Sequence, residues 1–336
     1  MTTIYDIAKA AGVTATTVSN VLSGKGSVGA ATKARVLKYV QELDYQPNLI
    51  ARSLIKGRTG VIGLVVGDMN NPFYAETTAA VERLAYTAGL RVFTTTFSGE
   101  DQVGQKLLED LILRQVDGIL VTSGSWSEQQ TIRSVSAMQL PIVYCFWEGT
   151  QPTSLLSIAL DFKQGGFLAG QHLLSLGHRR VGVITCFDSE GNDAHGIRVA
   201  GLQTALSQHG LLLDSTLLLN GQSSMEGGKV AAYKLLTHPD PPTAIFATTD
   251  AMAIGAMTAA WELGLQIPRD LSVVGLDDIS LAKYVVPSLT TITIDRVAVL
   301  SHAIKLLLDS IDGQQVTSPP PFSVSLVIRG STGRCP

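Results

Sequence analysis

Residues 1–45 carry hydrophobic side chains at helical spacing in three short segments. The three apolar stripes consist of Ile4, Ile7, Ala8 and Ala11, then Val18, Val21 and Leu22, then Val36, Val40 and Leu43. Thr3 and Asp6 have the spacing of a capping box, and Gly12 is placed to end the first helix. Thr14 can cap the second helix. The pattern predicts a helix-turn-helix arrangement followed by a third helix at about residues 31–43.

Three glycines between the second and third stripes, Gly24, Gly26 and Gly29, match the glycine fingerprint of a dinucleotide-binding loop. That fingerprint functions between a strand and a helix, because the glycines bring a pyrophosphate to the helix N-terminus. No strand-like run precedes these glycines, back to Met1. We therefore interpret the segment as a turn between helices and expect no cofactor. Its backbone amides and Lys25 could contact a phosphate.

From residue 60 onward, strand-like apolar runs alternate with helical stretches. The apolar runs are VIGLVVG, LRVFTTTF, DGILVTSG, PIVYCFW, RVGVITC, TAIFATT and LSVVGLDD. Helices are predicted at about residues 73–88, 102–114, 128–138, 162–176, 196–209, 224–236 and 251–263. Continuous apolar runs are typical of strands that are buried on both faces. The pattern therefore predicts an α/β fold with doubly wound parallel sheets, and ligands bind such sheets beyond the carboxyl ends of the strands.

Composition adds an asymmetry of charge to this picture. The chain has 336 residues, 45% of them hydrophobic and 16% charged, which is ample for two or three cores. Its net charge is −3, yet residues 1–60 hold eight basic and three acidic side chains, against 17 and 25 in the remainder. A basic N-terminal segment on an acidic body indicates a module that binds nucleic acid. The alternative is a chance cluster on a solvated face.

Other features of the composition favour the cytoplasm. The N-terminus carries Asp6 and Lys9 where a secretion signal would be apolar, and no apolar run approaches the length of a membrane span. The three cysteines, Cys145, Cys186 and Cys335, are far apart, which argues against a disulfide framework or a metal cluster. The six histidines show no spacing typical of metal ligands, so we expect no metal.

The motif TIYDIAKAAGVTATTVSNVLSGKGSV, followed by YQPNLIARSL, resembles the LacI/GalR family of bacterial transcription regulators. The segments DMNNPFYAE, HGIRVAGLQTAL, TTDAMAIGAM, VVGLDDISLA and LVIRGST also match, so the resemblance covers the whole chain. It implies a helix-turn-helix domain at 1–46, a hinge helix and linker at 47–59, and a core at 60–336 similar to periplasmic binding proteins. Lobe 1 of that core would comprise about residues 60–160 and 291–321, and lobe 2 about 161–290 and 322–330.

The resemblance implies a dimer, sometimes a tetramer, on a palindromic operator. The implied DNA-binding residues are Thr14, Ala15, Thr16, Thr17, Asn20, Lys25, Asn48, Ala51, Arg52 and Leu54. A hinge helix at about 48–54 would enter the minor groove, with Leu54 as a wedge that opens a base step. Asn20 stands where many members have Arg, and Asn suits adenine where Arg suits guanine. Gly29 replaces the usual Ser cap of the third helix, a change that costs only a few tenths of a kcal/mol.

Effector-binding candidates follow from positions at strand ends and from the resemblance. They are Asp68, Phe73, Ser123, Trp147, Asp161, Asn192, Arg198, Asp250 and Asp277. The two last aspartates could accept hydroxyl hydrogen bonds, Arg198 offers a fork of donors, and the aromatic residues could stack on a ring. The alternatives are core packing for the aromatics and loop caps or an internal salt bridge for the aspartates. Ser223 and Leu160 depart from residues common in the family, which leaves the effector open.

The sequence thus predicts a cytoplasmic, nucleoid-associated homodimer that regulates transcription, most often as a repressor. The effector is expected to be a sugar or sugar derivative, with a nucleobase or nucleoside corepressor as the alternative. From other classes, an enzyme and a solute-binding receptor for a transporter remain as alternatives. The chain has no Gly-x-Ser-x-Gly, His-Glu-x-x-His or Walker motif. The C-terminus has no leucine heptad, which favours a dimer over a tetramer.

Overall fold

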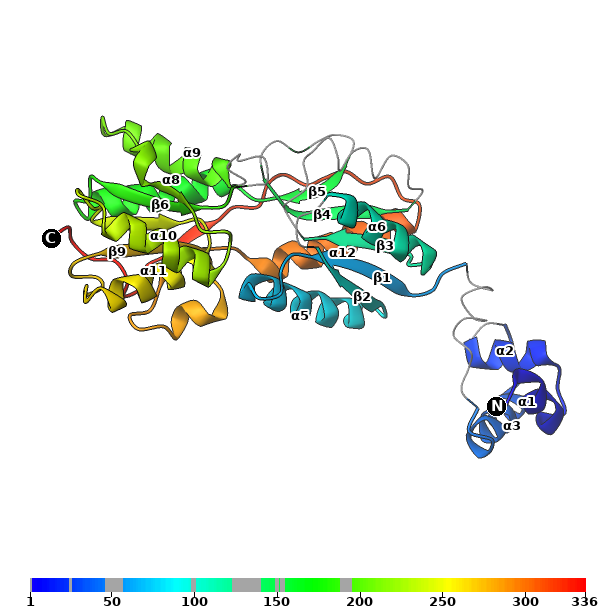
Figure 1. Cartoon of the computed structure of the whole chain (residues 1–336). Coiled ribbons are helices and arrows are strands. Elements are labelled where there is room, and N and C mark those ends of the chain that lie inside the picture. The colour runs from blue at the N-terminus through cyan, green and yellow to red at the C-terminus, as the bar shows by residue number, and fades with distance from the viewer. Residues whose placement is uncertain are drawn as a thin grey trace. The chain divides into compact units, whose positions relative to one another are not determined.

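The chain forms two compact units, Met1–Thr59 and Gly60–Pro336, which are drawn in Figure 1. The computed structural model describes residues 2–23, 26–45, 57–97, 101–122, 140–148, 151, 155–187 and 195–336. Each unit has its own hydrophobic core among these residues.

The first unit is a small all-helical domain. Its helices are α1 (Ile4–Ala11), α2 (Ala15–Ser23) and α3 (Ala30–Glu42). The predicted capping box is confirmed: the Thr3 backbone N–H donates to the Asp6 carboxylate over 2.8 Å, and the Asp6 N–H donates to the Thr3 hydroxyl over 3.4 Å. Gly12 ends α1 in the left-handed conformation. One side chain from each helix, Ile7, Val18 and Val36, is fully buried in the shared core.

The third helix confirms one expectation and corrects another. Gly29 is its N-cap and makes no side-chain hydrogen bond, yet the helix forms from the next residue onward. Leu43 is not part of the buried stripe, because α3 ends at Glu42 and the Leu43 side chain is 39% exposed. Tyr39 and Tyr45 pack against the core instead. Leu43 has the spacing of the helical stripe in the sequence, but α3 ends one residue before it.

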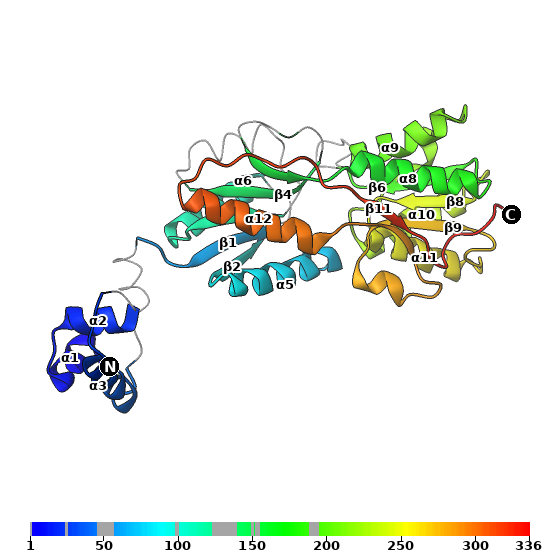
Figure 2. The same ribbon diagram turned by 180° about the vertical axis from the view of Figure 1, so that it is seen from behind.

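Lobe 1 of the second unit is built on a five-stranded parallel sheet in the order β2-β1-β3-β4-β5. The strands are β1 (Val61–Val66), β2 (Arg91–Thr96), β3 (Gly118–Val121), β4 (Ile142–Trp147) and β5 (Leu156–Ala159). Alternate side chains of β1 enter opposite cores: Leu64 lies in the core shared with α5 (Pro72–Thr87) and α12 (Arg296–Ile311), and Val65 in the core with α6 (Asp101–Leu113). Figure 2 shows α12 running along this lobe beside α5.

Lobe 2 is built on a six-stranded sheet in the order β11-β10-β9-β8-β6-β7. The strands are β6 (Val181–Thr185), β7 (Leu218–Asn220), β8 (Ala244–Ala247), β9 (Ser272–Asp277), β10 (Thr290–Thr293) and β11 (Ser325–Val327). Only β11 runs antiparallel to its neighbour among these described strands. One face is covered by α8 (Phe162–Ser175) and α9 (Gly196–Ser207), the other by α10 (Met225–Leu236) and α11 (Asp250–Glu262), as Figure 1 shows.

The helices α8 and α9 touch through their backbones. A Cβ atom at Gly166 would lie 1.8 Å from the carbonyl oxygen of Arg198, and one at Gly201 would lie 2.0 Å from that of Lys163. Any side chain at either glycine would therefore force the two helices apart. This contact fixes the position of the first turn of α9, which carries Arg198, against α8.

Three segments of chain join the two lobes. The first follows β5, where Leu160 forms a bridge with Phe322, and leads into α8. The second connects β10 to α12. The third returns from α12 past Phe322 to β11, and the Asp161 N–H donates to the Phe322 carbonyl over 3.0 Å. The first and third segments are thus hydrogen-bonded side by side at the point where they pass between the lobes.

The predicted α/β fold with an N-terminal helical domain and two parallel-sheet lobes is confirmed. The helix expected at 128–138 lies outside the described residues. The sequence analysis did not identify α12 or the strands β5, β7, β10 and β11. Within the described part of the chain, no helix has both the length and the apolar character needed to cross a membrane.

Candidate functional site

The start of α2 presents the first group of predicted DNA-contacting residues. Thr14 and Thr16 are exposed, and Ala15, Thr17 and Asn20 are partly buried. Thr14 caps the helix, because the Thr17 backbone N–H donates to its hydroxyl over 3.2 Å. The two threonine hydroxyls also lie 2.9 Å apart. The other predicted DNA-binding residues lie outside the described part of the chain: Lys25, Asn48, Ala51, Arg52 and Leu54.

A second group of polar and aromatic side chains gathers where the two lobes meet. We call Phe73, Tyr74, Glu148, Arg198 and Asp277 the inter-lobe cluster. The first three come from α5 and the end of β4 in lobe 1, and the last two from α9 and the end of β9 in lobe 2. Strand ends and helix starts meet here, as expected for parallel α/β sheets.

Arg198 is the best-connected member of the inter-lobe cluster. Its Nη1 donates to the carbonyl oxygen of Thr248 over 2.6 Å, and its Nε and Nη2 both donate to Oε1 of Glu148. The guanidinium lies over the Phe162 ring, 4.1 Å from the ring centroid. Burial acts to lower the pKa of Arg198, but the charges of Glu148 and Asp277 outweigh burial and the net shift is upward. Arg198 is therefore a buried, permanent cation.

Asp277 ends β9 and is almost fully buried, with a backbone φ of 127° that L-amino acids rarely adopt. Burial raises the pKa of its carboxyl well above the ordinary range, and repulsion from Asp250 and Glu148 acts in the same direction, against the attraction of Arg198 and Arg296. Arg296 also donates from Nη2 to the Asp277 carbonyl over 3.4 Å. The loop that follows β9 is thus strained and held from several sides.

The aromatic side of the inter-lobe cluster comes from lobe 1. Phe73 packs edge-on against Tyr74 and Phe146, with ring centroids 5.3 and 5.1 Å apart. The guanidinium of Arg296 lies 5.0 Å from the centroid of the Phe73 ring. Burial raises the pKa of the Tyr74 hydroxyl, and the Asp277 charge adds to the shift. Arg296 therefore touches both an aromatic member and an acidic member of the cluster.

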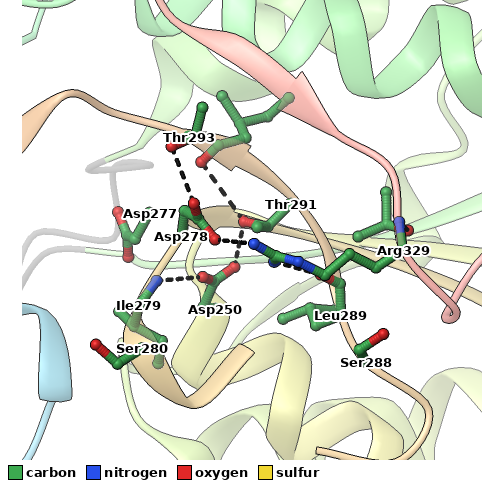
Figure 3. A network of polar contacts seen from close by, with 12 residues as sticks. Asp250, Asp277, Asp278, Ile279, Ser280, Ser288, Leu289, Thr291, Thr293 and Arg329 are labelled. Carbon is green, nitrogen blue, oxygen red and sulfur yellow. Dashed lines mark hydrogen bonds and ion pairs between the residues drawn. The ribbon is translucent and has the colours of Figure 1, made fainter. Parts of the chain in front are cut away.

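The Asp250 carboxylate holds the loop after β9 through hydrogen bonds within lobe 2. Asp250 is fully buried at the start of α11, where its carboxylate accepts hydrogen bonds from the Ile279 N–H over 2.9 Å and from the Thr291 hydroxyl over 2.5 Å. Burial raises its pKa to about 7. Figure 3 shows these contacts, with the Asp277 side chain pointing away from them. Because both oxygens of Asp250 have partners inside lobe 2, a supporting role fits this residue better than direct contact with a ligand.

A second carboxylate in Figure 3, Asp278, ties the same loop to the segment that follows β11. Asp278 accepts from Nη2 of Arg329 and from the Thr293 hydroxyl, the latter over 3.0 Å. Arg329, just beyond β11, also donates to the Leu289 carbonyl over 2.8 Å. The loop that carries Asp277 is therefore held by α11, by β10 and by the segment that follows β11.

The remaining effector candidates lie in different surroundings. Trp147 packs edge-on against Tyr144, 5.9 Å between ring centroids, in the core beside α6, while Phe146 faces Phe73. Asp68 is exposed and accepts from the Asn70 backbone and side chain over 2.9 Å. Asp161 is exposed and caps α8. Ser123 and Asn192 lie outside the described residues.

Three members of this site were not singled out in the sequence. Glu148 follows an apolar strand and stands next to Trp147, so the strand-end rule that selected Asp277 could have selected it too. Tyr74 adjoins Phe73 in the DMNNPFYAE motif. Arg296 gave no signal, because its contacts with Phe73 and Glu76 span more than two hundred residues of sequence.

A groove of about 450 Å³ borders the inter-lobe cluster at Arg296. It is lined by α5, the start of α12 and the loop after β9, at Glu76, Ala79, Ala80, Glu82, Arg83, Ser280, Arg296 and Val297. None of the predicted effector residues lines it. Across the described residues, no group of three or more His, Cys, Asp or Glu side chains could hold a metal ion.

Comparison with known proteins links both units to families. Residues 3–48 match the family model of bacterial regulatory proteins, lacI family, and residues 171–332 match that of the periplasmic binding protein-like domain. The ribose operon repressor of Haemophilus influenzae is 36% identical over 314 residues, which cover 93% of this chain and 92% of that protein. The transcriptional repressor PurR of the same species is 33% identical over 336 residues, covering 98% of each chain.

Solved structures agree with these sequence relationships. The Lac repressor dimer bound to operator and the anti-inducer ONPF is similar over 99% of each chain, with a TM-score of 0.90 and 27% identity. A LacI family regulator from Enterococcus faecium with bound ribose is similar over 81% of this chain and 98% of its own, with a TM-score of 0.72 and 27% identity.

Proposed function

The chain belongs to the LacI family of bacterial transcription regulators, and from this premise we propose that it is a repressor controlled by a small effector. It binds a palindromic operator as a homodimer, and the effector binds at the inter-lobe cluster. The observation that carries the proposal is the presence, in one chain, of an exposed helix start at Thr14 and Thr16 and of a buried polar cluster between two lobes. We further propose that this repressor acts in the cytoplasm in association with the nucleoid.

The operator is read by α2 and by the hinge. We assign Thr14, Ala15, Thr16 and Thr17 to base edges and flanking phosphates, because small polar side chains at the start of a recognition helix fit the major groove. Asn20 is assigned to an adenine in each half-site. Residues 47–59 form the hinge, in which Asn48, Ala51 and Arg52 contact the minor groove or its phosphates and Leu54 acts as the wedge. Lys25 is assigned to a phosphate.

The effector is a sugar in this proposal. Asp277 and Arg198 present an acceptor and a fork of donors from the same lobe, a pairing that suits a ligand rich in hydroxyl groups. Similarity to a ribose operon repressor and to a regulator with bound ribose supports that choice. A nucleobase or nucleoside corepressor is the second candidate, supported by the aromatic group of Phe73, Tyr74 and Phe146.

The remaining effector assignments are part of the same proposal. Phe73 and Asp277 contact the ligand, and Asp250 positions the loop that carries Asp277. We assign Ser123, Trp147, Asn192, Asp68 and Asp161 to the effector site from their positions in the sequence and from the family resemblance alone. An effector shifts the equilibrium between two arrangements of the lobes by binding one arrangement more tightly. The hinges of the dimer are then held together or released, which sets operator affinity.

The experiment that tests the function is selection of bound duplexes from a random library by the purified full-length protein without added ligand. We expect an enriched palindrome with a flexible central base step. The selection is repeated with cell-extract metabolites, which allows for a corepressor. No enrichment under either condition would reject the repressor assignment.

A further inference from the structure

The arginines near the loop after β9 are all matched by carboxylates of the protein itself. Arg198 pairs with Glu148, and Nη1 of Arg296 pairs with Glu76 over 2.7 Å. Arg329 pairs with Asp278. These pairs are largely buried: the Arg198 and Arg296 side chains are 8% and 14% exposed, and their partners 21% and 25%. Their mutual attraction is therefore only weakly screened by solvent and salt.

Two more carboxyl groups remain in the same region after this pairing. Asp277 and Asp250 have no arginine of their own. Burial raises the pKa of both carboxyls, and repulsion adds to it, from Asp250 and Glu148 at Asp277 and from Asp278 at Asp250. His195 does not compensate, because burial and the Arg198 charge hold its pKa well below the ordinary value. Among the described residues, the region therefore has a net charge of zero or below.

The N-termini of α5, α8 and α11 are already capped by side chains, whereas α9 begins after His195 without a side-chain cap. Asn71 caps α5 by accepting from the Phe73 N–H over 3.1 Å, and Asp161 caps α8 by accepting from the Gln164 N–H over 2.9 Å. Thr249 caps α11, and Asp250 occupies its first turn. Backbone amides that would otherwise bind a phosphate are used by these side chains.

From this charge balance we propose that the inter-lobe cluster selects an uncharged, hydroxyl-bearing ligand and rejects phosphorylated compounds. Glu148 is the residue that sets this selectivity, since it neutralises Arg198 from the opposite lobe. The inference rests on the proposed function, because it takes the inter-lobe cluster to be the effector site.

The hydrogen-bonding pattern of Arg198 agrees with a neutral ligand. A guanidinium has five N–H donors. Two of those of Arg198 point to Glu148 and one to Thr248, which leaves one N–H on each Nη atom. A phosphate that accepted from these two N–H groups would bring two negative charges next to the Glu148 carboxylate. Hydroxyl oxygens can accept the two remaining bonds without displacing Glu148.

The experiment measures binding of inorganic phosphate, D-ribose and D-ribose 5-phosphate to the full-length protein by isothermal titration calorimetry. We expect wild type to bind ribose 5-phosphate at least tenfold more weakly than ribose, and to show no measurable phosphate binding. Glu148→Gln keeps an oxygen that accepts from Arg198 but removes the charge. That variant should bind inorganic phosphate measurably, and its affinity for ribose 5-phosphate should be at least tenfold higher than that of wild type.

The matched control is Glu262→Gln, which removes the charge of a carboxylate that pairs with Lys229 over 2.7 Å on α10 and α11. It should leave all three affinities unchanged. Phosphate binding by wild type, or ribose 5-phosphate binding as tight as ribose, would overturn the proposal without any variant. Equal phosphate affinity in Glu148→Gln and wild type would overturn it as well. The comparison of phosphate affinity between wild type and Glu148→Gln tests the proposal even if ribose is not the effector. Operator selection tests the repressor function separately.

Discussion

The carboxylate of Glu76, on α5 of lobe 1, accepts a hydrogen bond from the backbone N–H of Ser280 in lobe 2 over 2.8 Å. The second oxygen of Glu76 binds Nη1 of Arg296, which in turn lies over Phe73 and donates to the Asp277 carbonyl. A single carboxylate thus joins the α5 surface to the loop that carries Asp277. A movement of that loop should therefore change the contacts of Glu76 on α5.

Replacement of Glu76 should loosen this loop. Glu76→Ala removes an acceptor from Ser280 and leaves Arg296 without its counter-ion, which should lower the free energy of unfolding by about 2 kcal/mol. Amide exchange at Ser280 should become at least tenfold faster, as measured by hydrogen exchange with NMR or mass spectrometry. Glu76→Gln retains the acceptor and should fall between wild type and Glu76→Ala.

The control for this prediction is Glu262→Ala, which breaks an ion pair of the same 2.7 Å length with Lys229 on the surface of lobe 2. Surface pairs contribute only about 0–1 kcal/mol, so stability should change little and Ser280 exchange should not change. Unchanged Ser280 exchange in Glu76→Ala would refute the proposed link between the lobes.

Asp250 predicts a pH dependence of stability. Its pKa is about 7 in the folded chain, above the ordinary 3.8, so the folded state binds more protons than the unfolded state between these values. The contribution of Asp250 to stability is therefore fully present below about pH 4 and is lost as pH rises through 7. The amide of Asp250→Asn does not titrate, so this variant does not lose stability in that way. The free energy of unfolding of Asp250→Asn minus that of wild type should therefore rise by on the order of 2 kcal/mol from pH 5 to pH 8.

Urea unfolding of both proteins at several pH values measures this difference. Asn can still accept from the Ile279 N–H, so the loop should remain formed. Asp240→Asn serves as the control: that carboxylate is 76% exposed and pairs with Arg180 on the surface, where such a pair contributes only about 0–1 kcal/mol. A constant difference between Asp250→Asn and wild type across the pH range would show that Asp250 does not titrate near neutrality.

Asp277 combines backbone strain with a role in binding. Its φ of 127° favours glycine. Asp277→Gly should therefore be more stable than Asp277→Ala by about 1 kcal/mol, because alanine keeps the strain. Both variants should bind operator like wild type and lose the response to effector, as measured by operator titration with and without the ligand. Greater stability of the alanine variant would contradict the strain, and a retained response would contradict the binding role.

Asn20 should determine one base pair of each half-site. Asn20→Arg should shift the preference at that position from A·T to G·C, with discrimination of about 1–3 kcal/mol. Duplex selection with the two proteins, read by sequencing, measures the change. Enrichment of the same base by both proteins would exclude Asn20 from base reading.

Leu54 should affect DNA binding alone. Leu54→Ala removes the proposed wedge, and we expect operator affinity to fall at least tenfold while the thermal shift caused by the effector stays at the wild-type value. Leu113→Ala is a suitable control, since Leu113 is 80% exposed on lobe 1 and has no proposed contact with DNA. Wild-type operator affinity in Leu54→Ala would rule out the wedge.

Local patterns in the sequence predicted local structure well. The capping box of Thr3 and Asp6, the end of α1 at Gly12 and the parallel sheets all depend on neighbouring residues or on continuous apolar runs. The prediction for Leu43 was wrong because helical spacing does not show where a helix ends. The short strands β7 and β11 have three residues each, too few for a periodic signal.

The site was predictable only in part, for a different reason. Position after a strand selected Asp277 and Asp250, but spacing could not show that Asp250 turns inward to Ile279 and Thr291. The pairing of Glu148 with Arg198 joins residues fifty positions apart on two lobes, and no local rule predicts it. Side chains that neutralise one another across a fold become visible only when the fold is known.

The close contact of α8 and α9 at Gly166 and Gly201 has a consequence for how ligand preference can change. Since neither glycine tolerates a side chain, the two helices keep one mutual arrangement, and Arg198 and Phe162 stay in register. Mutations that alter the response to a ligand are thus confined to residues that can change without moving these helices. Glu148 and the loop after β9 meet that condition. Among related proteins, we therefore expect substitutions that change ligand preference to occur at these positions, while the contact between α8 and α9 is retained.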